Sequence, residues 1–194
     1  MSKVVLGLSG GVDSALAARM LMDAGYEVYG VFLDIGITPP EDAKTVAEQL
    51  GIAFETVDIR DELEAKVCKP FAEAYLGGRT PNPCVMCNPT VKFPALVRAA
   101  DRIGAEYIAT GHYARVERDE VSGRYRLVRA DSSKDQSYML CGLSQDILSR
   151  VIFPLGDLEK ETVRQMAEDA GISVAHTTYK LNTSFLRSVK KFNK

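Results

Sequence analysis

A turn rich in glycine and hydroxyl side chains near the N-terminus contains the first residues that could do chemistry. An apolar run ends at Leu8, and Ser-Gly-Gly-Val-Asp-Ser follows at residues 9–14, before a helical pattern. The glycines permit a sharp turn close to a ligand, and the N-terminus of a following helix offers N–H groups to an anion. Asp13 adds a carboxylate that could hold the Mg²⁺ of a bound phosphate. The sequence predicts a nucleotide phosphate site here, although such glycines also serve only to pack helix on strand in many α/β proteins.

Two cysteines at C-x-x-C spacing, Cys84 and Cys87, form the second candidate centre. Such a pair can be a redox pair, half of a metal site, or two structural thiols. Arg79 and Lys92 flank the pair and would favour the thiolate, which is the nucleophilic form. Prolines bias the chain away from helix, so we expect a stiff, non-helical loop. The prolines of this stretch are Pro81, Pro83 and Pro89.

The remaining cysteines and the histidine of the central region are expected to be structural. Cys68 and Cys141 lie on segments with apolar periodicity, which predicts core positions. His112 follows a buried strand pattern, which favours a structural role over catalysis. Four cysteines without an export signal indicate reduced thiols more than a disulfide framework.

Composition excludes some classes of function. The 194 residues suit one domain, and 46% hydrophobic residues can build a sizeable core. The net charge of −2 gives no bulk attraction to nucleic acid, so any RNA contact must come from local patches. No apolar run approaches the roughly 20 residues of a membrane span. We therefore expect a cytoplasmic protein without membrane contact.

Strand and helix patterns alternate along the chain, which predicts the elements that position these residues. The predicted strands cover Lys3–Leu8, Glu27–Leu33, Ala53–Asp58 and Tyr107–Thr110. The predicted helices cover Asp13–Ala24, Glu41–Leu50, Asp61–Leu76 with a kink at Pro70, Asn88–Ile103 and Lys160–Ala170. Segments 115–117 and 125–129 read as a β-hairpin. The fold class is α/β, a doubly wound parallel sheet with a small β-hairpin insertion, whose ligands bind beyond the carboxyl ends of the strands.

Longer strings of residues resemble a known family. The turn at residues 9–14 resembles the pyrophosphate loop of ATP pyrophosphatases, which split ATP into AMP and pyrophosphate. Thr-Pro-Asn-Pro-Cys-Val-Met-Cys-Asn at 80–88 resembles the tRNA-specific 2-thiouridylases. The strings at 109–115, 134–138 and 153–156 agree, in family order. The similarity runs from Lys3 to about His176 and implies an adenine nucleotide alpha hydrolase-like fold.

This resemblance implies an ATP-dependent tRNA-uridine 2-sulfurtransferase. ATP would adenylate the C2 oxygen of the wobble uridine and release pyrophosphate, after which sulfur replaces AMP. The implied catalytic residues are the nucleophile Cys87, Asp13 and Cys84. The residues implied to hold ATP with Mg²⁺ are Gly7, Leu8, Ser9, Gly10, Gly11, Val12, Asp13, Ser14, Leu33 and Gly111. Those implied to contact tRNA are Asn82, Pro83, Cys84, Lys134, Asp135 and Gln136.

The chain departs from the family pattern near its C-terminal end. Ser184 stands where the family has a second cysteine that carries persulfide sulfur. We therefore expect a catalytic domain at 1–176 and a diverged basic tail at 177–194. The sulfur donor would be sulfide or a donor protein, and another chain would supply the missing tRNA-binding part. Some relatives bind an iron–sulfur cluster through this loop, so Cys84 and Cys87 are also candidate ligands of a cluster.

Two other functions fit the same residues. The chain could be an ATP pyrophosphatase that acts on a small molecule. It could also be a truncated form that binds nucleotide or RNA without thiolation. Pyrophosphate exchange that depends on RNA would separate the thiouridylase hypothesis from both.

Overall fold

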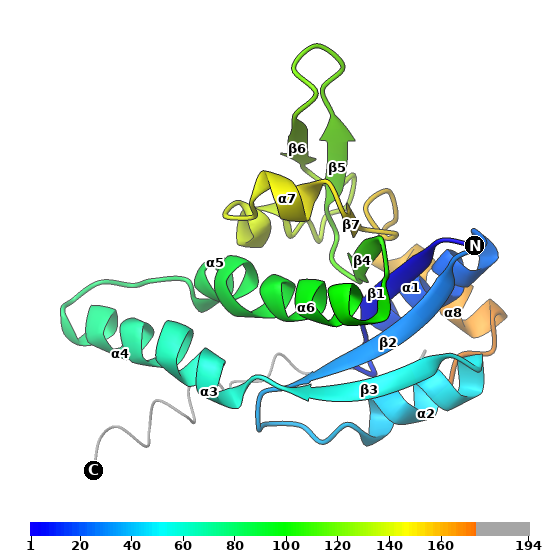
Figure 1. Cartoon of the computed structure of the whole chain (residues 1–194), viewed down its shortest axis with the longest axis horizontal. Coiled ribbons are helices and arrows are strands. Elements are labelled where there is room, and N and C mark those ends of the chain that lie inside the picture. The colour runs from blue at the N-terminus through cyan, green and yellow to red at the C-terminus, as the bar shows by residue number, and fades with distance from the viewer. Residues whose placement is uncertain (174–194) are drawn as a thin grey trace.

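A five-stranded parallel sheet forms the centre of the protein. The computed structural model describes residues 1–173, and its sheet has the strand order β3-β2-β1-β4-β7 (Figure 1). The strands are β1 (Lys3–Gly7), β2 (Glu27–Asp34), β3 (Ala53–Asp58), β4 (Tyr107–Thr110) and β7 (Val151–Ile152). The predicted α/β class with a parallel sheet is confirmed.

The strand order reverses at β1. β1 pairs with β2 on one side and with β4 on the other, all in parallel. The chain builds the sheet outward to β3 first and then crosses to β4 on the opposite side of β1. Ligands of open α/β sheets bind beyond the carboxyl ends of the strands at such a switch point. The turn at residues 9–14 lies at this point because it directly follows β1.

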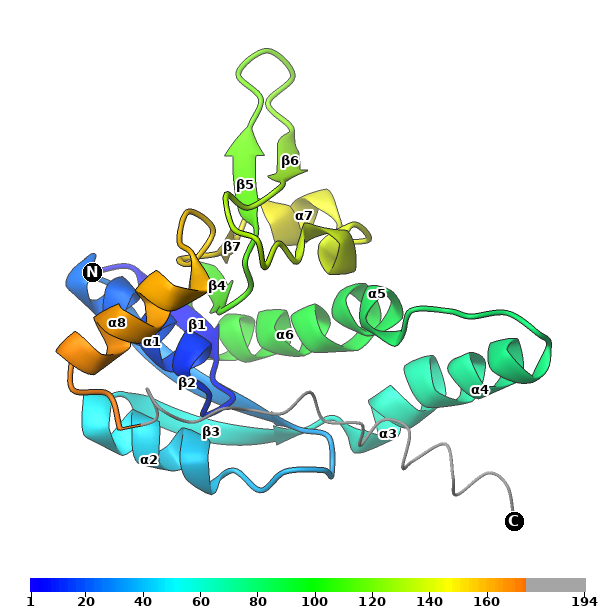
Figure 2. The ribbon, with the colours of Figure 1, turned by 180° about the vertical axis from the view of Figure 1, so that it is seen from behind.

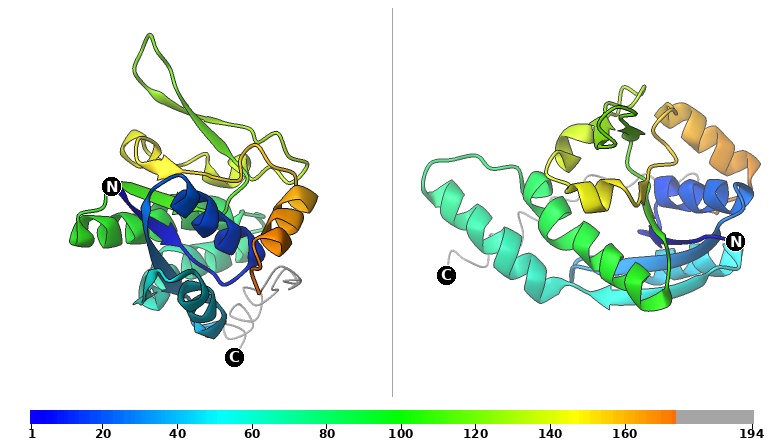
Figure 3. Two further views of the ribbon diagram at one scale, coloured as in Figure 1. Left: turned by 90° about the vertical axis from the view of Figure 1, so that its right-hand side faces the viewer. Right: turned by 45° about the horizontal axis from the view of Figure 1, so that its top comes forward.

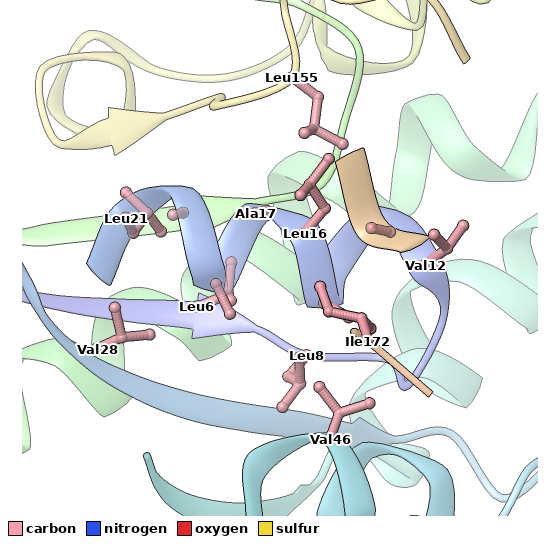
Figure 4. Close-up of a cluster of buried hydrophobic side chains, with 14 of the residues drawn as sticks. Leu6, Leu8, Val12, Leu16, Ala17, Leu21, Val28, Val46, Leu155 and Ile172 are labelled. Carbon is pink, nitrogen blue, oxygen red and sulfur yellow. The ribbon is translucent and has the colours of Figure 1, made fainter. Parts of the chain in front are cut away.

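Helices cover both faces of the sheet (Figures 2 and 3). Successive residues of β1 point to opposite faces, and Leu6 packs in one apolar cluster while Val5 packs in another. Leu16 belongs to the first cluster, between helix and sheet (Figure 4). The helices of the first face are α1 (Val12–Asp23), α2 (Glu41–Leu50) and α8 (Lys160–Asp169), and that of the second is α6 (Phe93–Ile103). The predicted doubly wound arrangement is therefore confirmed.

The helical segment after β3 is interrupted near its proline. It consists of α3 (Arg60–Leu63), a π-helix (Glu64–Cys68) and α4 (Lys69–Leu76). The wider π turn ends two residues before Pro70, which lacks the N–H that a regular helix would use. The helix is therefore broken near Pro70, as predicted, but at residues 64–68 and not at the proline itself.

The prediction of a non-helical proline loop is confirmed for residues 79–82 but is wrong for residues 83–87. Residues 83–87 form α5 (Pro83–Cys87), which continues through a π-helix (Asn88–Lys92) into α6. Pro83 lies in the first turn of α5, where its missing N–H costs no helical hydrogen bond. Pro89 lies in the π-helical segment, in the first turn after α5. Pro83 and Pro89 both occupy the start of a helical segment, where a proline is tolerated. The number of prolines alone therefore gave a wrong prediction for residues 83–87.

Shorter elements lie beyond β4. The predicted hairpin is present as β5 (Arg115–Arg118) and β6 (Tyr125–Val128), an antiparallel pair that projects from the sheet (Figure 1). A 3₁₀ helix (Ser137–Leu140) and α7 (Gln145–Leu148) follow it, and the sequence pattern did not predict either. Among the described helices, none is long and apolar enough to cross a membrane.

Two predictions about single residues concern the core and the tail. Cys68 is buried as predicted, but Cys141 is exposed, so the prediction of a core position for Cys141 is wrong. Cys141 directly follows the buried Leu140, at the end of the 3₁₀ helix. Beyond the helix end, the spacing of apolar residues does not predict which side chains are buried. Ser184 and the predicted boundary after residue 176 lie outside the described residues.

Candidate functional site

The turn between β1 and α1 is built to leave helix N–H groups available. Gly10 has φ +80°, and a Cβ on it would lie 2.7 Å from the backbone nitrogen of Ala43, so only glycine fits. Ser14 Oγ donates to the Gly11 carbonyl at 3.0 Å and accepts from Ser9 N–H at 3.2 Å. No side chain caps the N-terminus of α1. The first N–H groups of this helix can therefore serve an anion.

The Asp13 carboxylate at the start of α1 has two donors. Its Oδ1 accepts from Tyr113 Oη at 2.8 Å and from Lys160 Nζ at 2.5 Å. Burial, and then the negative charge of Asp13, raise the pKa of Tyr113 above its ordinary value. The Tyr113 hydroxyl therefore stays protonated and donates. The sequence signal for Tyr113 was its place in the string at 109–115, while nothing local distinguished Lys160, which lies 147 residues from Asp13.

Gln136 holds the backbone of Tyr113 at two points. Its side-chain Oε1 accepts from Tyr113 N–H at 3.1 Å, and its own N–H donates to the Tyr113 carbonyl at 2.8 Å. The neighbouring Asp135 accepts from Ala130 N–H at 2.8 Å and from Ser137 Oγ at 2.9 Å. The segment predicted to contact tRNA is thus held firmly, and one of its members supports the residue that bonds to Asp13.

The two cysteines of the candidate centre lie on a capped helix. Asn82 Oδ1 accepts from Cys84 N–H at 2.9 Å and from Val85 N–H at 3.4 Å, so its side chain is the N-cap of α5. Cys84 is exposed and Cys87 is half-buried. Burial raises the pKa of Cys87, and the nearby Lys92 ammonium lowers it in part. Lys92 favours the thiolate as predicted, but burial is the larger influence, so the pKa of Cys87 lies above its ordinary value.

His112 lies between aromatic rings beside the same helix. Its Nδ1 lies 2.7 Å from Thr110 Oγ1. The centre of its ring lies 6.1 Å from the centre of the Phe93 ring and 6.3 Å from that of the Phe153 ring. Burial, with a contribution from Lys92, lowers the pKa of His112 to about 3. The imidazole is therefore neutral at physiological pH.

One cavity of about 540 Å³ joins the turn and the cysteines. Its size falls within the ~300–1,000 Å³ typical of ligand sites. The predicted site residues that line it are Gly7, Leu8, Ser9, Asp13, Ser14, Leu33, Pro83, Cys84, Cys87, Gly111 and Gln136. The predicted residues that do not line it are Gly10, Gly11, Val12, Asn82, Lys134 and Asp135. Lining residues that the sequence did not single out for the site include Ile35, Ile37, Thr38, Asn88 and Met139.

The backbone of Gly111 packs closely against the start of α1. A Cβ on Gly111 would lie 2.9 Å from the carbonyl carbon of Asp13. A larger residue would therefore push the end of β4 away from the start of α1.

The described residues do not fit an iron–sulfur cluster. No three His, Cys, Asp or Glu side chains within residues 1–173 lie close enough to share a metal ion. Cys84 and Cys87 therefore have neither Cys68 nor Cys141 as a further ligand, and clusters take four. The two thiols are free in this structure.

Comparison with protein families identifies the domain. The family model described as "tRNA methyl transferase HUP domain" matches residues 2–187. The chain belongs to this family.

Curated relatives of this family member are named tRNA-specific 2-thiouridylase MnmA. The protein from Treponema denticola is 49% identical over 187 residues, which cover 90% of this chain and 51% of that protein. The protein from Halalkalibacterium halodurans is 45% identical over an alignment of 205 residues, gaps included. The alignment covers 98% of this chain and 55% of that protein. The chain thus spans about half the length of the curated relatives it matches.

Solved structures support the fold of the domain. A predicted subunit of tRNA methyltransferase from Methanocaldococcus jannaschii aligns with TM-score 0.54 at 22% identity, covering 87% of this chain and 76% of that one. NMN synthetase from Francisella tularensis aligns with TM-score 0.57 at 19% identity, covering 91% and 66%. These similarities show a shared architecture only.

Proposed function

We propose that this chain activates a tRNA uridine with ATP and replaces its C2 oxygen with sulfur. The observation that supports the proposal is the single cavity lined by both the pyrophosphate-loop residues and Cys87. Adenylation and sulfur transfer act on the same carbon atom, so a shared cavity is what the two steps need. The names of the relatives supply the substrate class.

The turn before α1 binds the ATP phosphates. The uncapped N–H groups of α1 and the hydroxyls of Ser9 and Ser14 suit phosphate oxygens. The Asp13 carboxylate is the oxygen ligand type that Mg²⁺ prefers, and it lines the cavity. When bound, Mg²⁺ supplies positive charge against the phosphate oxygens. Lys160, ion-paired to Asp13, adds a cation from the protein itself.

In the first step, O2 of the uracil attacks the α-phosphorus of ATP. The new O–P bond forms as the bond to pyrophosphate breaks, and N3 of the uracil loses its proton to solvent. The poor leaving oxygen at C2 becomes part of AMP, a good leaving group. Positioning of the two reactants in one cavity is the main contribution of the protein here.

In the second step, the Cys87 thiol gives its proton to solvent, its Sγ attacks C2, and AMP leaves with the electrons of the C2–O bond. Hydrosulfide then attacks C2, expels the Cys87 thiolate, and its proton moves to N3 to give 2-thiouridine. Nucleophilic catalysis of this kind divides one difficult displacement into two easier ones. Cys84 lines the same cavity and is the second thiol available to this site. Sulfide serves better than a persulfide donor, since Ser184 cannot carry persulfide sulfur.

RNA contacts complete the proposal. Pro83 and Gln136 line the cavity, while Asn82, Lys134 and Asp135 lie on the adjoining segments. A partner chain or further protein sequence contributes the remaining contacts with tRNA. A cytoplasmic location, where tRNA and reduced thiols occur, accompanies this function.

Pyrophosphate exchange into ATP, with and without tRNA, tests the proposal. We expect exchange that depends on tRNA. Exchange without RNA would indicate a small-molecule substrate instead. No exchange under either condition would overturn the proposal.

A further inference from the structure

The hydrogen bonds to Asp13 all converge on one carboxylate oxygen. Tyr113 Oη and Lys160 Nζ both donate to Oδ1, and within the described part of the chain no donor reaches Oδ2. Asp13 lines the cavity. Hydrogen bonds to Oδ1 fix the direction in which Oδ2 points. Oδ2 is therefore the oxygen that remains available to a ligand.

Tyr113 is suited to hold that direction. Tyr113 is 2% exposed, and its hydroxyl donates to Asp13 Oδ1 at 2.8 Å. Gln136 fixes its backbone from both the N–H and the carbonyl side. Lys160, by contrast, is a flexible side chain whose ammonium also lies 5.9 Å from the centre of the Tyr113 ring. Tyr113 is therefore the more rigidly held of the two partners of Asp13.

We propose that Tyr113 is a positioning residue that orients the Asp13 carboxylate for Mg²⁺-bound ATP. This inference rests on the proposed function of the turn before α1. Outer partners of a metal-binding carboxylate typically change metal affinity by ~10–100-fold when removed. The Tyr113 hydroxyl occupies that outer position, since it touches Asp13 and donates to the oxygen opposite the free one.

Gln136 has a defined place in this arrangement. Because it holds the tyrosine backbone, loss of its side chain removes one of the two bonds that fix Tyr113. The backbone bond from Gln136 N–H remains. We therefore expect the loss of the Gln136 side chain to act in the same direction as loss of the Tyr113 hydroxyl, with a smaller effect.

The test is the binding of α,β-methylene-ATP, which cannot be cleaved, measured by calorimetry with Mg²⁺ and with EDTA. Tyr113→Phe keeps the ring and removes only the hydroxyl. We expect its affinity to fall about 10-fold with Mg²⁺ and to match the wild type in EDTA. Gln136→Ala should lie between them. Tyr75→Phe, an exposed tyrosine far along the chain from this site, is the matched control and should bind as the wild type does.

The outcomes separate this inference from the function on which it rests. Equal Mg²⁺-dependent affinity in Tyr113→Phe and wild type would overturn the positioning role while leaving ATP binding intact. Equal losses with Mg²⁺ and with EDTA would also overturn it, because a general structural defect does not depend on the metal. If the wild type itself binds no analogue, the proposed function and this inference both fail. Thermal unfolding of each variant verifies the fold.

Discussion

The pyrophosphate-loop side and the cysteine side of the cavity are built in different ways. Asp13 has its hydrogen-bond partners in place, and glycines with close backbone neighbours shape its turn. Cys87 instead lies at the end of a five-residue helix that passes into a π-helix, with a thiol whose pKa burial raises. The first region is therefore held in place by its own contacts. The second holds a thiol that burial keeps mainly protonated at neutral pH.

The largest expected effect comes from removing the Asp13 carboxylate. Asp13→Ala should lower pyrophosphate exchange by about 100-fold or more, since one preorganised electrostatic group is typically worth ~10²–10³ in rate. Alkylation of Cys87, measured by peptide mass spectrometry, should not change. Unchanged ATP affinity and unchanged pyrophosphate exchange in Asp13→Ala would contradict the difference assigned to the pyrophosphate-loop side and the cysteine side of the cavity.

The next effect concerns the shape of the turn. Gly10→Ala combines a φ of +80° with a Cβ 2.7 Å from Ala43 N, whereas Gly25→Ala has a φ of +85° and open space around it. Left-handed backbone alone costs ~1–3 kcal/mol, so Gly10→Ala should lower the free energy of unfolding by more than Gly25→Ala does. Chemical denaturation of both variants measures the difference. Equal losses would show that the close approach at Gly10 does not constrain the turn.

A smaller effect is expected at the cap of α5. Asn82→Ala removes the acceptor for two N–H groups, and loss of an N-cap typically costs about 1 kcal/mol. Hydrogen exchange at the amides of residues 84–87 should become faster, while the exchange of α1 amides stays as before. Substitution of Ser144, the cap of α7, serves as a comparison outside the cavity. Unchanged exchange at residues 84–87 would mean that the cap does not hold α5.

The smallest effect is a change in pH dependence. The pKa of Cys87 lies above its ordinary value, so its alkylation rate should rise as the pH increases through the alkaline range. Lys92 lowers this pKa, so Lys92→Met should move the curve to still higher pH. Lys66→Met, which removes a surface lysine paired with Glu62, is the control. A curve that moves to lower pH in Lys92→Met would contradict the assigned electrostatics.

The sequence predicted those parts of the molecule that depend on local chemistry. Strand Tyr107–Thr110 and helix Glu41–Leu50 have the predicted bounds, because apolar periodicity and a terminal glycine define them locally. The number of prolines does not reveal the helical state of Cys84 and Cys87, because a proline in the first turn of a helix, such as Pro83, does not break it. The Asp13–Lys160 pair could not be predicted, because the two residues meet only through packing of α8 on α1.

Thiouridine formation in the presence of sulfide, ATP and tRNA tests the central claim most directly. Wild type, Cys87→Ser and Cys141→Ser are compared, since Cys141 is exposed and does not line the cavity. We expect 2-thiouridine with the wild type and Cys141→Ser, and none with Cys87→Ser, which still exchanges pyrophosphate when tRNA is present. A full yield of 2-thiouridine from Cys87→Ser would contradict it.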